Sequence, residues 1–280
     1  MDQTAERSHE SRREPVAIIG AGVMGETLVS GLLRSGRTPE QLLVSDRSAE
    51  RLATLSKQYA VQVLAAADAV PQVTTVVLAV KPQDMGAVLE AIGPHLQPGT
   101  LVVSIAAGIT TAFLEERLPE GTPVARVMPN TPALVDEGMA AVSGGTHCEA
   151  HHMWVAQDLM RSCGKVGTVP EEHQDAVTAI SGSGPAYIFY VVEAMIEAGV
   201  LLGLPRGTST ELVVQTLYGA ATMLKETGEH PTVLRERVSS PGGTTMSALR
   251  ELDDHKVRAA FLTAMEAAAR RSAELASGQA

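Results

Sequence analysis

The sequence predicts an α/β N-terminal domain built on a doubly wound, mostly parallel sheet, followed by an all-helical C-terminal domain. Three observations predict this fold: short β-branched runs alternate with helical stretches up to about residue 169, the strand-like runs then stop, and 280 residues suit two domains of ordinary size. We therefore expect a disordered tail over 1–14, a dinucleotide-binding domain over 15–170 and a helical domain over 171–280.

Five apolar runs are the clearest strand candidates of the first domain. They are VAIIG, LLVSD, TVVLAV, LVVSIA and VARVM, which begin at residues 16, 42, 75, 101 and 124. The segments between them are long enough for crossover helices, so we expect parallel pairing with helices on both faces. The stretch before them mixes charges of both signs and lacks the apolar core of a signal peptide.

The second domain is expected to be helical and to pair with a second subunit. Its predicted helices cover 184–203, 208–227, 233–238, 244–252 and 256–276. The first of these is very apolar, but Glu193 and Glu197 would be costly inside a bilayer, so we expect a buried helix and no membrane span. This much apolar helical surface is normally covered by a partner, which favours a homodimer over packing on the chain's own first domain.

Composition excludes several classes of function. A net charge of -10 and an aromatic content of 3% argue against a nucleic-acid partner. The two cysteines, Cys148 and Cys163, make neither a disulfide framework nor a CxxC site, which fits a reducing, cytoplasmic location. His147 and His151 would be four apart on a helix, but no H-E-x-x-H pattern accompanies them, so we expect no metal.

The stretch VAIIGAGVMGETL contains G-x-G-x-x-G at Gly20, Gly22 and Gly25, directly after a strand and at the start of a helix. The first glycine permits the tight turn, the second lets the backbone approach a pyrophosphate, and the third lets helix and strand lie close. The amides around Val23 and Met24 would face the phosphates. This context predicts a Rossmann domain; the alternative is a glycine-rich turn that binds nothing.

Further cofactor candidates follow the other strands. Asp46 and Arg47 stand where the adenine ribose should lie: the acid favours NAD(H), the arginine can bind the 2'-phosphate of NADP(H), and we favour NADP(H) with NAD(H) possible. The alternative for Arg47 is a solvated charge. The remaining candidates are Ala79, Val80, Lys81, Pro82, Ala106, Ala107, Gly108 and Asn130. The amide of Asn130 either meets the nicotinamide or satisfies its own turn.

The stretch SSPGGTTMSAL, which begins at Ser239, precedes a predicted helix. As a plain connector, Pro241 would stop one helix and Thr244 would cap the next. One glycine suffices for a turn, however, and here Gly242 and Gly243 precede two hydroxyls at a helix N-terminus. Successive amides in such a loop form a concavity that suits a carboxylate.

Together with GAGVMG, AVKPQ, MPNTPA and SGSGPAY, this PGGTT loop resembles the pyrroline-5-carboxylate reductase family over nearly the whole chain. The resemblance implies a Rossmann domain, an interlocking helical dimerisation domain, often a ring of dimers, and reduction of 1-pyrroline-5-carboxylate to L-proline with NAD(P)H. The substrate-binding residues it implies are Glu226, Ser240, Gly242, Gly243, Thr244 and Thr245. Family members often carry asparagine near Ala66, and alanine cannot supply its hydrogen bond to the adenine ribose.

A protonated cyclic imine accepts hydride readily, so the expected enzyme mainly aligns its reactants. The Thr245 hydroxyl, or a water that it positions, would hydrogen-bond to the imine nitrogen and serve as the catalytic group. Two alternatives remain: a β-hydroxyacid dehydrogenase or other imine reductase, and a dinucleotide-sensing protein without turnover. The hydroxyacid enzyme should use a lysine of the helical domain, and neither Lys225 nor Lys256 stands in a suitable motif.

Overall fold

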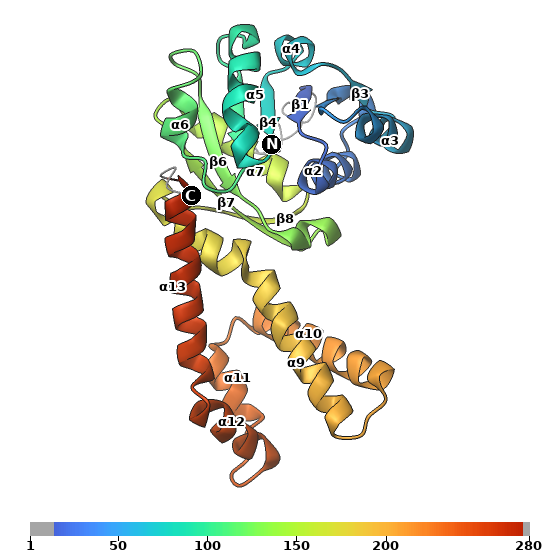
Figure 1. Cartoon of the computed structure of the whole chain (residues 1–280), viewed down its shortest axis with the longest axis vertical. Coiled ribbons are helices and arrows are strands. Elements are labelled where there is room, and N and C mark those ends of the chain that lie inside the picture. The colour runs from blue at the N-terminus through green and yellow to red at the C-terminus, as the bar shows by residue number, and fades with distance from the viewer. Residues whose placement is uncertain (1–13, 277–280) are drawn as a thin grey trace, which may run out of the picture. The chain divides into compact units, whose positions relative to one another are not determined.

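The computed structural model describes residues 14–276 and divides them into two compact units (Figure 1). The first unit holds the described residues up to Ser183 and those from Ala268 onward, and the second is Gly184–Ala267. This division differs from the expected one at 170/171, because residues 171–183 are hydrogen-bonded to the first unit. The expected tail lies outside the described residues, apart from Glu14, whose carbonyl accepts a hydrogen bond from Arg37.

An eight-stranded sheet forms the centre of the first unit, and it is parallel except for the pair β6–β7. In spatial order its strands are β3 (Gln62–Val63), β2 (Leu42–Ser45), β1 (Val16–Ile19), β4 (Thr75–Leu78), β5 (Leu101–Ser104), β6 (Val124–Met128), β7 (Gly138–Gly144) and β8 (Gly164–Thr168). All five expected strands are present, and the doubly wound sheet is confirmed. The strand order reverses beside β1 and β4, where such sheets bind ligands at their carboxyl ends.

Helices cover both faces of this sheet (Figure 1). The helices of the two faces are α2 (Val23–Arg34), α3 (Ala49–Tyr59) and α7 (Ala150–Arg161), and then α4 (Ala66–Ala69), α5 (Met85–Ile92) and α6 (Thr111–Glu115). The alternation of side chains along β1 explains the two layers, because Ile18 packs with Leu28 of α2 while Ile19 packs with Leu89 of α5. The carboxyl edge between the layers stays accessible.

Strands β7 and β8 were not singled out by the sequence, and their composition gives the reason. GMAAVSG and GKVGT are rich in small residues with low strand propensity. The two strands instead need glycine for close contact: a Cβ on Gly164, where φ is +148°, would lie 2.1 Å from the Gly138 carbonyl oxygen. Such contact is a tertiary property that local propensity does not report.

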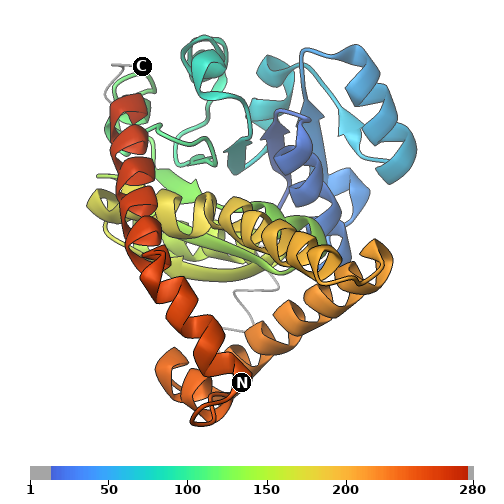
Figure 2. The same cartoon turned by 60° about the horizontal axis from the view of Figure 1, so that its bottom comes forward.

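The second unit consists of helices, as expected. They are α9 (Gly184–Leu201), α10 (Arg206–Thr227), α11 (Pro231–Arg237), α12 (Thr244–Asp254) and the part of α13 (Val257–Ala276) that precedes Ala268. α9 and α10 are joined at Gly203, where φ is +95° (Figure 2). They cross closely, since the Ser209 hydroxyl donates to the Ile196 carbonyl at 2.8 Å and a Cβ on Gly199 would lie 2.1 Å from that hydroxyl.

Helix α9 is not buried within one chain, so the expectation of a buried helix is wrong for the single subunit. None of its described residues is buried, and Phe189, Tyr190 and Leu201 are 65%, 75% and 87% exposed. The stretch Glu171–Leu201 is long enough to cross a membrane, and an 18-residue window within it has a mean hydropathy of 1.3. Glu193 and Glu197 interrupt it, so an apolar partner surface remains the better match.

Candidate functional site

A cavity of about 550 Å³ opens at the carboxyl edge of the sheet, beside the loops that follow β1, β2 and β4. Its lining brings together seven of the residues predicted to bind the cofactor: Gly20, Gly22, Asp46, Arg47, Ala79, Val80 and Lys81. The loops of three strands therefore converge on one space, as the strand order requires.

The three motif glycines have different structural reasons to lack a side chain. Gly20 has a φ of +111°, and a Cβ there would lie 2.5 Å from the Ala79 carbonyl oxygen. A Cβ on Gly25 would lie 2.0 Å from the Gly20 carbonyl oxygen, so these two glycines hold the turn together. A Cβ on Gly22, in contrast, would meet nothing within 4 Å.

Gly22 is also the N-cap of α2, and no side chain caps this helix start. Gly22 lines the cavity, and the uncapped amides at the start of a helix suit a diphosphate. A side chain on Gly22 would occupy that space without harming the fold. The residues present thus fit a dinucleotide.

The glycine loop is held by hydrogen bonds to both the amide and the carbonyl of Ala21. The Ala21 amide donates to Asp46 Oδ2 at 2.6 Å, and the Ser48 amide donates to Asp46 Oδ1 at 2.8 Å. On the other side, Arg51 Nε and Nη2 donate to the Ala21 carbonyl at 3.0 and 2.8 Å, and Nη2 also contacts Glu26 at 2.6 Å. Asp46 therefore braces the loop, and its contact with ribose stays a prediction.

Arg47 has a partner that the sequence did not indicate. Its Nη2 lies 2.8 Å from Oδ2 of Asp84, which also lines the cavity. The Arg47 side chain is 84% exposed, so its remaining donors stay open to a ligand. Ala65 and Ala66 line the same cavity and offer no side-chain donor.

The other predicted cofactor residues do not line this cavity: Val23, Met24, Gly25, Pro82, Ala106, Ala107, Gly108 and Asn130. Met24 and Asn130 instead line a small cavity of about 20 Å³. The Asn130 side chain donates to the Ser181 carbonyl at 3.0 Å and accepts from the Met139 amide at 2.8 Å. It therefore braces neighbouring segments rather than its own turn, and one amide N–H is left for a ligand.

The predicted substrate residues lie in the second unit. Gly242 has a φ of +69°, and Gly243 is the N-cap of α12, with no side chain capping it. The expectation that Thr244 caps the helix is therefore wrong: Thr244 is its first helical residue, because the chain turns one residue earlier. A Cβ on Gly243 would lie 2.6 Å from Ser240 Oγ, so only glycine lets this hydroxyl fold over the turn.

Glu226 does not line the cavity of the second unit. Glu226 is exposed in the last turn of α10. A cavity of about 830 Å³ lies among α11, α12 and α13, with Ser239, Met246 and Ser247 in its lining. The predicted substrate residues from Ser240 to Thr245 do not line it, so this cavity is not the expected substrate site.

The histidines and cysteines of the described residues form no further reactive site. His147 precedes α7, so it does not share a helix with His151, and among residues 14–276 no cluster of three His, Cys, Asp or Glu side chains could hold a metal. Burial raises the pKa of Cys148 to about 11. Burial also raises the pKa of Cys163. Neither thiol is therefore a ready nucleophile.

Comparison with known proteins assigns both halves of the chain. Residues 171–275 match the model for pyrroline-5-carboxylate reductase dimerisation, and residues 15–108 match NADP oxidoreductase coenzyme F420-dependent. A pyrroline-5-carboxylate reductase of Corynebacterium melassecola is 47% identical over 93% of this chain and 98% of its own. One from Mycobacterium tuberculosis is 43% identical over 93% and 96%.

Solved structures agree with the sequence relatives. A pyrroline-5-carboxylate reductase from Coxiella burnetii has a TM-score of 0.89 at 35% identity and covers 94% of this chain and 98% of its own. A pyrroline carboxylate reductase from Plasmodium falciparum, solved with NADP bound, has a TM-score of 0.85 at 31% identity, with 94% and 98% covered. The chain belongs to the pyrroline-5-carboxylate reductase family.

Proposed function

We propose that this protein reduces 1-pyrroline-5-carboxylate to L-proline, with a reduced nicotinamide dinucleotide as the hydride source. The observation that carries the proposal is the 47% identity to a reductase of that name over 93% of the chain. The glycine-lined cavity of about 550 Å³ provides the matching cofactor site.

The first unit holds the dinucleotide in this proposal. Amides at the start of α2 bind the diphosphate, and the clamp on Ala21 by Asp46 and Arg51 fixes their direction. The bound nicotinamide supplies a hydride equivalent. Alanines and the glycine at 106–108, which follow β5, leave room for its flat ring.

The second unit holds the substrate. Amides of Gly243, Thr244 and Thr245 face the carboxylate at the start of α12, where the helix dipole favours an anion. The Thr245 hydroxyl, or a water held by it, donates a hydrogen bond to the neutral imine nitrogen and accepts one from the N–H once that nitrogen is protonated, which favours the protonated form. Glu226 contributes to the surroundings of the substrate. A protonated C=N bond is the form that accepts hydride.

We favour NADP(H) over NAD(H), because Arg47 keeps donors free beside the ribose region while both oxygens of Asp46 already accept backbone amides. The dimerisation domain and the exposed apolar side chains of α9 support a homodimer, and a larger ring of dimers is a further expectation. A cytoplasmic location fits the two free cysteines.

The test is a steady-state assay of the purified protein with NADPH and with NADH. We expect oxidation of the cofactor that depends on 1-pyrroline-5-carboxylate, with a higher kcat/KM for NADPH. Cofactor binding without substrate-dependent oxidation would support a dinucleotide sensor instead. Equal efficiency with both cofactors would remove the preference and leave the reaction in place.

A further inference from the structure

A buried arginine of the first unit, Arg126 on β6, has no part in the proposed chemistry. Its side chain is only 6% exposed; Nη1 lies 3.3 Å from Glu171 Oε1, and Nη2 lies 3.8 Å from Asp175 Oδ1. Burying the guanidinium is costly because it loses hydration, and the two half-buried carboxylates offset that cost only in part, so the cluster is weak evidence for stability alone. The position of this cluster in the fold suggests a role in function.

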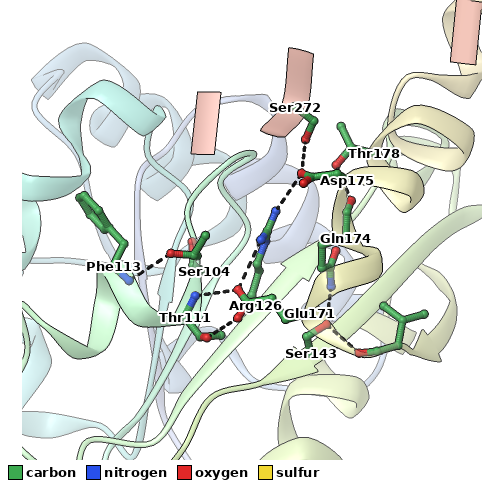
Figure 3. A network of polar contacts seen from close by, with 12 residues as sticks. Ser104, Thr111, Phe113, Arg126, Ser143, Glu171, Gln174, Asp175, Thr178 and Ser272 are labelled. Carbon is green, nitrogen blue, oxygen red and sulfur yellow. Dashed lines mark hydrogen bonds and ion pairs between the residues drawn. The ribbon is translucent and has the colours of Figure 1, made fainter. Parts of the chain in front are cut away.

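The first carboxylate, Glu171, holds the start of α6. The Thr111 amide donates to Glu171 Oε1 at 2.7 Å, and the Thr111 hydroxyl donates to Oε2 (Figure 3). Thr111 stands three residues after Gly108, at the end of the loop that follows β5. Glu171 therefore fixes one end of the loop that we assign to the nicotinamide.

The second carboxylate, Asp175, holds the last turns of α13. Its Oδ1 accepts a hydrogen bond from the Ser272 hydroxyl at 2.7 Å, and Ser272 is 4% exposed. The same turns touch the loop after β5, since a Cβ on Gly108 would lie 3.3 Å from the Leu275 Cβ. Figure 3 shows Arg126 between the two carboxylates, with Thr111 and Ser272 at opposite ends of the network.

Both carboxylates belong to a segment that is itself anchored. Gln174 is fully buried, and its Nε2 donates to the Ser143 hydroxyl at 2.8 Å and to the Ala141 carbonyl at 3.3 Å on β7. The chain enters the second unit after Ser183 and returns at Ala268. The network thus joins the segment before the exit and the segment after the return.

We propose that Arg126, Glu171, Asp175 and Ser272 are positioning residues for hydride transfer: they fix the loop after β5 against both segments through which the chain connects to the substrate-binding unit. The proposal rests on the proposed function, because it assigns residues 106–108 to the nicotinamide. Loosening the network should disturb alignment more than cofactor affinity, because the amides that we assign to the diphosphate lie elsewhere, at the start of α2.

The variants are Asp175→Asn, which removes the negative charge that faces Arg126, and Ser272→Ala, which removes the hydroxyl that donates to Asp175; both nearly keep the shape of the side chain. Glu116→Gln is the matched control, because Glu116 pairs with Arg117 at the surface of the same unit and is 71% exposed. In the cofactor-free protein, hydrogen exchange of the amides at 105–112 and 268–276 should rise several-fold in Asp175→Asn and stay unchanged in the control. This measurement requires no substrate, so it tests the network even if the proposed reaction fails.

With NADPH deuterated at the transferred position, Asp175→Asn should lower kcat about tenfold and raise the isotope effect on kcat, while the Kd of NADPH stays within about twofold. Ser272→Ala should act in the same direction more weakly, and the double variant should lose less than the sum of the two. The proposal is overturned if the folded variants keep wild-type exchange at 105–112, or if kcat and the isotope effect stay unchanged. A wild-type protein without turnover would instead refute the proposed function.

Discussion

Replacing Arg47 by alanine should separate the two cofactors. Its Nη2 lies 2.8 Å from Asp84, and the side chain lines the cavity and is 84% exposed, so other N–H donors are available to a ligand. The 2'-phosphate is the group that distinguishes NADPH from NADH, and we propose that it binds at Arg47, which lines the cavity together with Ala65 and Ala66. Arg47→Ala should therefore weaken NADPH and leave NADH nearly unchanged.

The size of this effect follows from the exposure of the side chain. A hydrogen bond to a charged group contributes about 1.5–3 kcal/mol net. Arg47 is 84% exposed and already forms an ion pair with Asp84, so its contribution to NADPH binding should lie near the lower limit of this range because solvent screens it. About 1.5 kcal/mol corresponds to a rise of about tenfold in the Kd of NADPH.

The assay is titration calorimetry of both cofactors at one fixed ionic strength, for the wild type, Arg47→Ala and Arg51→Ala. Arg51 is the matched arginine, because it holds the Ala21 carbonyl rather than facing the ribose. We expect Arg51→Ala to weaken NADPH and NADH to a similar extent. If Arg47→Ala also weakens both cofactors equally, the assignment of Arg47 to the 2'-phosphate is refuted.

The further predictions concern the substrate loop, the glycine turn and the half-buried thiol of Cys148. Thr245→Ala should lower kcat/KM for pyrroline-5-carboxylate by roughly ten- to a thousandfold in steady-state assays, and unchanged kinetics would remove Thr245 from the site. Gly25→Ala should lower both Tm and cofactor affinity, since its Cβ would lie 2.0 Å from a backbone oxygen, whereas Gly22→Ala should lower affinity alone; equal Tm losses would contradict this. Because burial raises the pKa of Cys148 from 9.0 to about 11, its alkylation at pH 8 should be slow until the protein unfolds. The free energy of unfolding should fall as the pH rises from 9.0 towards 11, where the unfolded thiol ionises first; a flat profile would argue against the shift.

Local patterns predicted the parts of the site that lie within one turn or one strand end. The spacing of Gly20, Gly22 and Gly25 led directly to the turn at the cavity, and the strand ends placed Asp46 and Lys81 there. These positions depend on short-range geometry, because a parallel strand delivers its carboxyl end to a common edge.

Contacts between distant segments were not readable from the sequence. Arg51 reaches Ala21 across 30 residues, Arg47 reaches Asp84 across 37, and Arg126 reaches Glu171 across 45. Each pair forms only because strand order brings the segments together, and no local pattern marks the partner. The prediction that α9 is buried failed for a related reason. Its apolar side chains predict that another surface covers them, and a single chain does not supply that surface.

The most direct test of the proposed reaction is to detect transfer of the hydride from NADPH to the substrate. The wild-type protein is incubated with 1-pyrroline-5-carboxylate and NADPH deuterated at the transferred position, and the product is analysed by mass spectrometry and NMR. We expect L-proline with one deuterium on the former imine carbon, which is the ring carbon bonded to nitrogen that does not carry the carboxylate. Bound NADPH without deuterated proline would contradict it.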